Sequence, residues 1–590
     1  MLRRRRASLT AKSSVPYGIE TLKCLESPLE GKTYINTGIL PDGNVFIDTY
    51  AAVANDSNSR ESYVCGSNTY ANGGVERGVI LLAKFANDFQ QKVWFGNKNH
   101  RFAKFSDCDK HRWVFKDKKL SIDNELIYDF SDVETTTSNA PLVVFGDGNR
   151  WINSSQGYID SVDGGSNTKI FSFQMRCNDK SINLVPSLDK TETPCMFDLV
   201  SRKNFYNAGT GQFKYIRPNG LPSDYTQVEY LESDDKCGIS TGYYPTNKTV
   251  VETEVNVLNS KIYGRVFGTY GGGQNGSYTL YFNSGLLVAD FYSRHTKNNS
   301  CEFNKKTHIH FGQDGIILDG NLIITPNKIS NWTSSIELDI WSCGSIENTE
   351  EKVSGNMRVY WFKIFEDGQI VRNFIPALDP NGIPCMYDTV GQKPYYNAGT
   401  GNFKYVRLNG LPSDYTPVEY LQAGAYSYIE TNYAIEPDDV IYSKVLIPQQ
   451  YTAVYFQDTK MAAVRLDYWG TRANTWFGDN TNSQIVMRDF SLNKVSEVYN
   501  STACTKLNGD IRIRNISNYD KNQVTNKLTL FAKNNRQDIN TPYVGGRIYR
   551  FTITNHGKTV MDLLPVLDKN GRPCMYDVIS QKALYNKGAG

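Results

Sequence analysis

Alternation of apolar and polar positions along the chain predicts β-strands. Residues 251–257 (VETEVNV) and 510–516 (DIRIRNI) largely alternate with period two, the pattern of a strand that buries one face. No long stretch combines helical periodicity with capping residues. The chain is also rich in residues that strands and turns favour, with 38 Tyr, 28 Phe and 47 Gly. These patterns together predict an all-β protein.

Turn motifs separate the predicted strands. Residues 379–382 (Asp-Pro-Asn-Gly) place Pro where φ is preset and Gly where φ can be positive, and residues 568–571 (Asp-Lys-Asn-Gly) keep most of that logic. Residues 189–192 (Asp-Lys-Thr-Glu) lack the glycine, so we expect a different turn there. The pairs Asp319-Gly320 and Asn508-Gly509 predict tight hairpins.

Three copies of one unit follow one another in the chain. The blocks around Pro194, Pro384 and Pro573 share the patterns apolar-Pro-x-Leu-Asp, Pro-Cys-Met-aromatic-Asp and Tyr-Asn-x-Gly. An aromatic residue precedes the Tyr in two copies, and Leu584 takes that place in the third. The spacings between the three prolines are 190 and 189 residues. Identity this dense at a near-constant spacing indicates tandem duplication of a domain.

The opening of each repeat marks the predicted domain boundaries. Residues 221–225 (Leu-Pro-Ser-Asp-Tyr) return as residues 411–415, and residues 15–19 carry a degenerate version. We therefore predict a basic tail over residues 1–14 and units over residues 15–220, 221–410 and 411–590. A unit of this length can bury a core of its own. Many short strands with regular turns then predict three tandem jelly-roll β-sandwich domains, each made of two packed antiparallel sheets.

Charge excludes some classes of partner and gives the N-terminus a separate role. The chain has 64 Lys and Arg against 61 Asp and Glu, and four of the basic residues are Arg3, Arg4, Arg5 and Arg6. Without these four the charges nearly balance, so we expect no nucleic-acid-binding face. We interpret the arginine run as a docking tail for another protein, with contact to nucleic acid or a membrane as the alternative. No apolar run is long enough for a membrane span, and the start lacks the apolar stretch of a secretory signal.

Cysteine spacing argues against a zinc site and against a disulfide framework. The 11 cysteines include no Cys-x-x-Cys pair. Three of them, Cys195, Cys385 and Cys574, recur in the same Pro-Cys-Met context. We expect these three to be small buried hydrophobic residues in a protein made in a reducing cytosol.

The repeated blocks also carry a family resemblance. With the Leu-Pro-Ser-x-Tyr opening and the Met-Leu-Arg-Arg-Arg start, they resemble the concanavalin A-like (laminin G-like) modules of virion appendage proteins from phages of gut bacteria. The resemblance implies a jelly-roll fold and a virion location, in a tail fibre or receptor-binding component that binds host-surface glycan, or in a head fibre, collar or decoration protein. It implies other virion proteins as partners, and a homo-oligomer stays open. Some modules of this fold bind calcium, but no acidic cluster marks a site here, and we expect no cofactor.

The wider fold includes glucanases, so the resemblance leaves an enzymatic role to be tested on the residues. Such glucanases carry a Glu-x-Asp-x-x-Glu strand that places carboxylates on one face. The nearest match, Glu337-Leu-Asp-Ile-Trp-Ser342, lacks the last acid, and Asp339 is not repeated in the other two units. We therefore expect a solvated strand face at Glu337 and Asp339, and no catalysis.

Two further motifs have both a binding and a structural interpretation. His308 and His310 would share one strand face and suit a metal, but no third ligand is evident, so we favour a satisfied or exposed pair. The repeated Tyr-Asn-x-Gly block at Tyr206, Tyr396 and Tyr585 suits a sugar site, yet we favour a turn, because residues kept in all three units serve the shared fold.

Aromatic residues in the divergent stretches are the candidate glycan contacts. Trp94-Phe95-Gly96 and Trp476-Phe477-Gly478 resemble each other, and their aromatic side chains would form carbohydrate platforms or, as we favour, lie in core strands. Recognition residues are expected where the units differ. Glycan binding and a purely structural virion role both remain open on this pattern.

Overall fold

The computed structural model describes most of the chain and contains strands as its only regular elements there. It leaves out residues 1–15, 17–18, 29–32, 54–61, 72–73, 86–89, 104–108, 135–137, 154–156, 165–167, 190, 235, 259–263, 270–276, 284–285, 299–302, 344–355, 425–426, 450–451, 459–461, 470–471, 480–483, 488–489, 515–526, 532–545 and 589–590. Among the described residues, no helix is long and apolar enough to cross a membrane. The predicted all-β class is confirmed.

The first pair of sheets takes its strands from residues 20–216. Its larger sheet follows the order β11 (Glu125–Asp129), β10 (Lys119–Ile122), β9 (His111–Lys116), β4 (Phe46–Val53), β15 (Thr168–Cys177), β16 (Lys180–Leu188), β17 (Pro194–Asp198) and β18 (Asn204–Tyr206), with β1 (Glu20–Thr21), β2 (Cys24–Ser27) and β19 (Lys214–Ile216) attached. The smaller sheet follows β14 (Gly157–Gly164), β13 (Gly146–Asn153), β5 (Ser62–Ala71), β6 (Gly74–Phe85), β7 (Gln90–Phe95) and β8 (Lys98–Phe102), with β3 (Ile35–Asn36) and β12 (Val143–Val144). We call this pair the first sandwich.

The second pair takes its strands from residues 226–407 and is called the second sandwich. Its larger sheet contains β20 (Thr226–Glu232), β22 (Thr249–Val257), β26 (Lys306–Gly312), β27 (Gly315–Leu318), β28 (Asn321–Ile324), β30 (Met357–Glu366), β31 (Gln369–Leu378), β32 (Pro384–Asp388), β33 (Lys393–Tyr396) and β34 (Lys404–Arg407). The smaller sheet follows β21 (Ile239–Ser240), β29 (Asp339–Ile340), β23 (Gly264–Thr269), β24 (Ser277–Asn283) and β25 (Leu286–Asn298).

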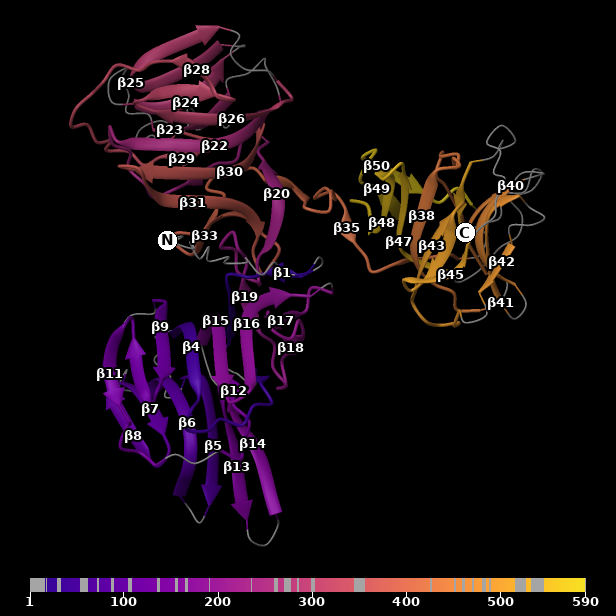
Figure 1. Ribbon diagram of the computed structural model, residues 1–590. Helices are drawn as coiled ribbons and strands as arrows, with labels where there is room; N and C mark the ends of the chain where they lie inside the picture. The colour runs from indigo at the N-terminus through magenta and orange to yellow at the C-terminus, as the bar shows by residue number, and fades with distance from the viewer. Residues whose placement is uncertain are drawn as a thin grey trace, which may run out of the picture. The chain divides into compact units, whose positions relative to one another are not determined.

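The third pair takes its strands from residues 416–585 and is called the third sandwich. Its larger sheet follows β45 (Asp510–Arg514), β44 (Cys504–Leu507), β43 (Ser496–Ser501), β38 (Asp439–Leu446), β47 (Arg547–Asn555), β48 (Lys558–Leu567), β49 (Pro573–Asp577) and β50 (Lys582–Tyr585), with β35 (Thr416–Pro417) and β36 (Leu421–Gln422). The smaller sheet follows β37 (Ile429–Glu430), β46 (Thr529–Leu530), β39 (Thr452–Asp458), β40 (Ala462–Trp469), β41 (Arg472–Asp479) and β42 (Gln484–Met487). In Figure 1, β38, β43 and β47 lie beside one another in one layer, and β40, β41 and β42 lie in the other.

The two sheets of each pair meet across an apolar core. In the second sandwich, the ring of Phe311 on β26 lies 5.3 Å from that of Phe267 on β23 and 4.7 Å from that of Tyr278 on β24. The first and third sandwiches bury residues from both sheets in one cluster, among them Ile47, Trp113, Phe173, Val64 and Val144 in the first and Ile441, Phe551, Tyr455 and Leu466 in the third. Where their register is described, the strands pair antiparallel except for β13 and β5, which run parallel in the smaller sheet of the first sandwich. Packed sheets of this kind are the architecture of concanavalin A-like domains, and the predicted sandwich fold is confirmed. The boundaries at residues 220 and 410 stay a prediction, and by compactness the chain divides into residues 1–226 with 362–395 and residues 227–361 with 396–590.

The turn after the Leu-Asp motif is the same in all three repeats, which corrects one expectation. The Asp379 carboxylate accepts hydrogen bonds from the amides of Asn381 and Ile383 at 2.9 and 2.8 Å, and Gly382 has φ +79°. Asp189 accepts the corresponding bonds from Thr191 and Thr193 at 2.8 and 3.0 Å. The first repeat, predicted to turn differently, forms this turn with Glu192 at φ +60° in place of glycine. The aspartate bonds fix the turn strongly enough for a non-glycine residue to adopt the left-handed region.

The segments at residues 217–223 and 407–413 form identical turns. The Arg407 amide donates to the Leu411 carbonyl at 2.9 Å, and the Ser413 amide donates to the Tyr405 carbonyl at 2.8 Å. Leu411 is fully buried beside Val566 and Cys574. The first segment repeats these bonds between Arg217 and Leu221 and between Ser223 and Tyr215, at 2.9 and 2.8 Å. Each linker is thus held by backbone hydrogen bonds and one buried leucine.

Candidate functional site

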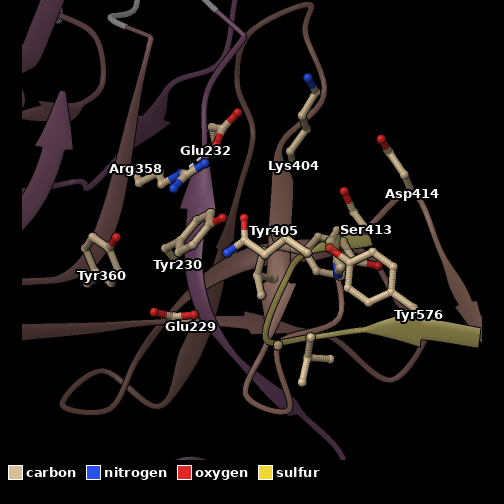
Figure 2. A pocket seen from close by; sticks show the side chains of 15 residues that line it. Glu229, Tyr230, Glu232, Arg358, Tyr360, Lys404, Tyr405, Ser413, Asp414 and Tyr576 are labelled. Carbon is tan, nitrogen blue, oxygen red and sulfur yellow. Dashed lines mark hydrogen bonds and ion pairs between the residues drawn. The ribbon is translucent and has the colours of Figure 1, made fainter. Parts of the chain in front are cut away.

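A cavity lined mainly by tyrosines and charged residues is the candidate functional site. Its volume is about 380 Å³. The lining comes from β20, β30 and β34, from the linker after β34, and from β49 with the turn that follows it (Figure 2). It consists of Glu229, Tyr230, Glu232, Arg358, Tyr360, Lys404, Tyr405, Val406, Gly410, Pro412, Ser413, Asp414, Tyr576, Val578 and Gln581.

Strand register brings the central charged residues together. β20 pairs antiparallel with β30, so that Glu232 lies opposite Arg358, and on its other side β20 pairs with β34, where Glu232 lies opposite Lys404. Side chains alternate between the two faces of a strand and directly opposed residues share a face. Glu232 therefore stands between two cations on neighbouring strands.

An arginine that contacts a carboxylate and the ring of one tyrosine forms the centre of the site. Arg358 Nε donates to Glu232 Oε2 at 2.7 Å, and its guanidinium lies 4.6 Å from the centre of the Tyr230 ring. The rings of Tyr230 and Tyr360 meet almost edge to face with centroids 5.4 Å apart. Lys306 Nζ lies 4.1 Å from the Tyr360 ring. Figure 2 shows Arg358 and Glu232 pointing toward each other beside Tyr230. Cation–π contacts and a charge-assisted hydrogen bond hold these side chains in one arrangement.

Electrostatics keep the tyrosine neutral and the arginine charged. Burial raises the pKa of Tyr230 to about 12, because the phenolate is poorly solvated there. Burial by itself would lower the pKa of Arg358, but the hydrogen bond to Glu232 outweighs it, and that pKa is raised. At neutral pH the site thus presents a phenol hydroxyl, an ion pair and aromatic rings.

The chemistry of this lining suits recognition of a polyhydroxylated ligand. Tyrosine rings offer apolar faces, and the carboxylates, the cations and the Ser413 hydroxyl offer directional hydrogen bonds. The described lining contains neither histidine nor cysteine. Of the possible nucleophile and base pairs, no Ser-His or Cys-His arrangement lies in this lining.

The structure places two of the four candidate glycan contacts in the core, which is the alternative favoured from the sequence. Phe95 is 2% exposed and Phe477 is fully buried, each inside the core of its sandwich. Both are core residues and present no surface to a ligand. Trp94 is half-buried, with Lys92 Nζ 4.1 Å from its ring centre, and its role as a contact stays a prediction. The side chain of Trp476 lies outside the described residues, as do Arg3, Arg4, Arg5 and Arg6.

The Tyr-Asn-x-Gly block is structural in all three repeats, as favoured from the sequence. Asn207 accepts from the Tyr34 amide at 3.0 Å and donates to the Gly211 carbonyl at 2.6 Å. Asn397 makes the same two bonds, to Gly238 at 3.0 Å and to Gly401 at 2.7 Å. Each asparagine thus links the final loop of its sandwich to the loop before β3 or β21. Its side-chain amide is hydrogen-bonded to the backbone on both sides.

The carboxylates of the glucanase-like segment lie differently from the expectation. Asp339 is 9% exposed on β29, which lies between β21 and β23. The predicted solvated strand face is therefore wrong for Asp339. Glu337 accepts a hydrogen bond from the Ser240 hydroxyl.

The histidines and the repeated cysteines have structural surroundings. His310 Nε2 lies 3.0 Å from Asp314 and its Nδ1 lies 3.4 Å from Glu252. Among the described residues, no group of three or more His, Cys, Asp or Glu side chains could hold a metal ion. The repeated cysteines are fully buried, as predicted, and burial raises the thiol pKa to about 12, 12 and 11 at Cys195, Cys385 and Cys574.

Sequence reasoning missed the central residues of the cavity. Tyr230 and Arg358 are 128 positions apart and belong to stretches that look like ordinary alternating strands. A signal was nevertheless present, because Tyr-Leu-Glu in the second repeat returns as Tyr-Leu-Gln, and Arg-Val-Tyr returns as Arg-Ile-Tyr. The first repeat has Cys-Leu-Glu and Lys-Ile-Phe instead.

Comparison with known proteins finds a partial similarity in sequence and low-scoring similarities in structure. No protein-family model matches the chain. Pesticidal crystal protein Cry19Aa of Bacillus thuringiensis subsp. jegathesan is 26% identical over 137 residues, which cover 23% of this chain and 21% of that protein. The match thus spans only about a fifth of the length of that relative.

Two laminin structures are similar at low scores. The LG1-3 region of the laminin alpha2 chain gives a TM-score of 0.27 at 8% identity and covers 94% of this chain and 100% of that one. Domains LG4-5 of the mouse laminin alpha1 chain give a TM-score of 0.20 at 10% identity, covering 57% of this chain and 91% of that one. Scores this low carry no argument, and the fold assignment rests on the sheets and their cores.

Proposed function

We propose that this chain is a non-catalytic virion appendage protein of a phage, a tail fibre or receptor-binding component, that binds host-surface glycan. The tyrosine-lined cavity around Arg358 carries the proposal. Its volume of about 380 Å³ falls in the range of roughly 300–1,000 Å³ typical of small-ligand sites. The resemblance of the repeated blocks to phage appendage modules supports the virion setting.

Binding would use the fixed side chains as they stand. The Tyr360 and Tyr405 side chains supply aromatic surface for the apolar face of a sugar ring, while Lys404, Asp414 and Ser413 supply hydrogen bonds to its hydroxyls. Because Arg358 is already bonded to Glu232 and packed on Tyr230, the site loses little side-chain entropy on binding.

The same contacts support binding without hydrolysis. A glycosidase needs one carboxyl group that is protonated and a second that is free to act on the sugar. Glu232 instead forms an ion pair with Arg358 at 2.7 Å. The glucanase-like segment at Glu337 lacks its last acid.

A purely structural virion role is the second candidate. It is supported by the linkers, in which Leu221 and Leu411 are fully buried and the backbone is held by paired hydrogen bonds. A linker of this kind suits a spacer.

The experiment is titration calorimetry of the purified protein against neutral bacterial surface oligosaccharides, with released reducing ends measured in the same samples. Saturable binding without released ends is expected. Tyr360→Ala and Tyr405→Ala should each weaken binding about five- to tenfold through the lost aromatic surface. Tyr244→Ala, at an exposed tyrosine outside the cavity lining, is the matched control and should bind as the parent does.

Three outcomes would count against the proposal. Release of reducing ends would contradict binding without catalysis. An equal loss of affinity in the Tyr244 and Tyr360 variants would show that the cavity is not the binding site. Failure to bind any glycan of the panel would favour the structural role.

A further inference from the structure

The stacked arginine of the candidate site recurs in the third sandwich. Gln422 on β36 lies opposite Arg547 on β47, as Glu232 lies opposite Arg358. Arg547 Nε donates to Gln422 Oε1 at 2.9 Å, and its guanidinium lies 4.4 Å from the centre of the Tyr420 ring. The rings of Tyr420 and Tyr549 are 5.4 Å apart, the same separation as in the second sandwich. The four side chains Tyr420, Gln422, Arg547 and Tyr549 are called the third-sandwich cluster below.

The first sandwich shows that the fold does not require this cluster. At the same register, Glu26 on β2 lies opposite Lys169 on β15. Cys24 and Phe171 stand where the other repeats have tyrosines, and the Lys169–Glu26 ion pair is long at 3.7 Å. Its strands pair in the same way with no arginine and no tyrosine at these positions. Two of the three repeats therefore keep an Arg-Tyr stack that β-sheet formation alone does not explain.

The two clusters differ in the charge of the group that accepts the hydrogen bond from the arginine. In the second sandwich, the Glu232 carboxylate neutralises Arg358 through an ion pair at 2.7 Å. In the third sandwich, the Gln422 carboxamide accepts the equivalent hydrogen bond but carries no charge. The hydrogen bond is thus preserved while the positive charge of Arg547 is left uncompensated by its own partner. A guanidinium in that state favours a carboxylate, which it can bind through two parallel hydrogen bonds.

Two side chains of the third-sandwich cluster are also more exposed to solvent than their counterparts around Arg358, which favours access of a ligand. Tyr230 is 7% exposed, whereas Tyr420 is half-buried, and Gln422 is exposed. Arg547 is half-buried beside them. A ligand can therefore reach the guanidinium and both rings of the third-sandwich cluster from solvent.

We propose that the third-sandwich cluster is a second sugar site, selective for a sugar that carries a carboxylate, such as a hexuronic acid. Arg547 binds the carboxylate, and Tyr420 and Tyr549 contact the sugar ring. The idea rests on the proposed function in one respect, since it takes the Arg-Tyr stack to be a sugar-binding element. It goes beyond that function by giving the two sandwiches different ligands, neutral glycan at Arg358 and acidic glycan at Arg547.

Reciprocal exchange of the partner residue tests the proposal with nearly isosteric changes. The probes are a hexuronic acid oligomer and the same oligomer with its carboxyl groups reduced, titrated calorimetrically at low salt. Gln422→Glu neutralises Arg547 and is expected to weaken binding of the acidic oligomer about tenfold. Glu232→Gln is the matched variant and is expected to add acidic-oligomer binding at the second sandwich. The reduced oligomer should bind the third-sandwich cluster at least about tenfold more weakly, because the charge-assisted bonds are lost.

The results separate this proposal from the previous one. Unchanged acidic-oligomer binding in Gln422→Glu, or equal binding of the reduced oligomer, overturns the acidic site at Arg547. Absence of acidic-oligomer binding to the parent protein overturns it as well. Loss of neutral-glycan binding in Tyr360→Ala tests the site at Arg358, and that test does not depend on any of these three results. Thermal unfolding of each variant shows whether the fold is retained, and Arg547→Gln provides a second variant that removes the charge without adding a carboxylate.

Discussion

Trp341 lies against Phe403, with ring centroids 4.7 Å apart at 48°. Trp341 follows the short strand β29 with φ +61°, a conformation that costs a bulky residue free energy, and it is fully buried. The first sandwich has the same contact between Phe145, at φ +68°, and Phe213 at 5.0 Å. The aromatic residue just before β19 and β34 thus packs on the strained aromatic residue and offsets its cost.

Removing the Phe403 ring should therefore destabilise the second sandwich. Phe403→Ala leaves a cavity beside Trp341 and is expected to lower the free energy of unfolding by about 3 kcal/mol. Phe403→Leu fills most of the space and should cost about 1 kcal/mol. Urea denaturation followed by tryptophan fluorescence measures both variants. A loss below that of the leucine variant would show that the ring contact does not support the Trp341 conformation.

Gly410 tests how tightly the second linker is held. Gly410 has φ +83°, and a Cβ atom there would lie 2.9 Å from Val578 Cβ, so alanine meets both backbone strain and a steric clash. Gly509 has a similar φ of +89° with open space around its Cβ position. Gly509→Ala is expected to cost about 1 kcal/mol from backbone strain alone, and Gly410→Ala about 1–3 kcal/mol more. Thermal and urea unfolding compare the two variants. Equal losses in the free energy of unfolding would show that the linker accommodates the added methyl group without further destabilisation.

Asp568 should make the third sandwich sensitive to acid. Burial by itself would raise the pKa of Asp568, but hydrogen bonds from the Arg572 amide and side chain outweigh it and lower the pKa to about 2 from 3.8. A carboxylate with a depressed folded pKa adds stability above its unfolded pKa, and the protein loses that stability as pH falls through the folded value. The melting temperature should therefore fall between about pH 4 and pH 2, and Asp568→Asn should flatten that fall.

The control for this acid sensitivity is Asp438→Asn. Asp438 is a carboxylate of the same sandwich whose side chain is 62% exposed and 3.4 Å from His556. Its replacement is expected to change the pH profile of melting less than Asp568→Asn does. If both variants keep the slope of the parent protein, another group causes the loss of stability in acid.

Much of the fold could be predicted from local chemistry. Repetition at 190 and 189 residues predicted three related units, and period-two alternation predicted strands such as β22. Asp379 and Gly382 predicted a turn because only a few residue types accept its backbone angles. Retention of Cys385 in every repeat predicted burial, since residues kept in all copies serve what the copies share.

Alternation along a strand does not reveal which residues meet across strands. Phe95 and Phe477 looked like a candidate ligand platform, but their side chains point between the sheets, which only the packing of two layers decides. Asp339 looked solvated from its sequence neighbours, yet its side chain is buried in the folded protein.

By itself the sequence determined the repeat, the strand-rich class and the turns, because those depend on residues that are neighbours in the chain. Only the tertiary structure decided where function can lie. Arg358 and Glu232 are separated by 126 residues and meet through strand register alone. The cavity adds β34 with the linker that follows it, and β49 from a more distant stretch of the sequence. The energy of such a site comes from contacts between distant segments, and alternation along one strand does not specify which distant residues meet.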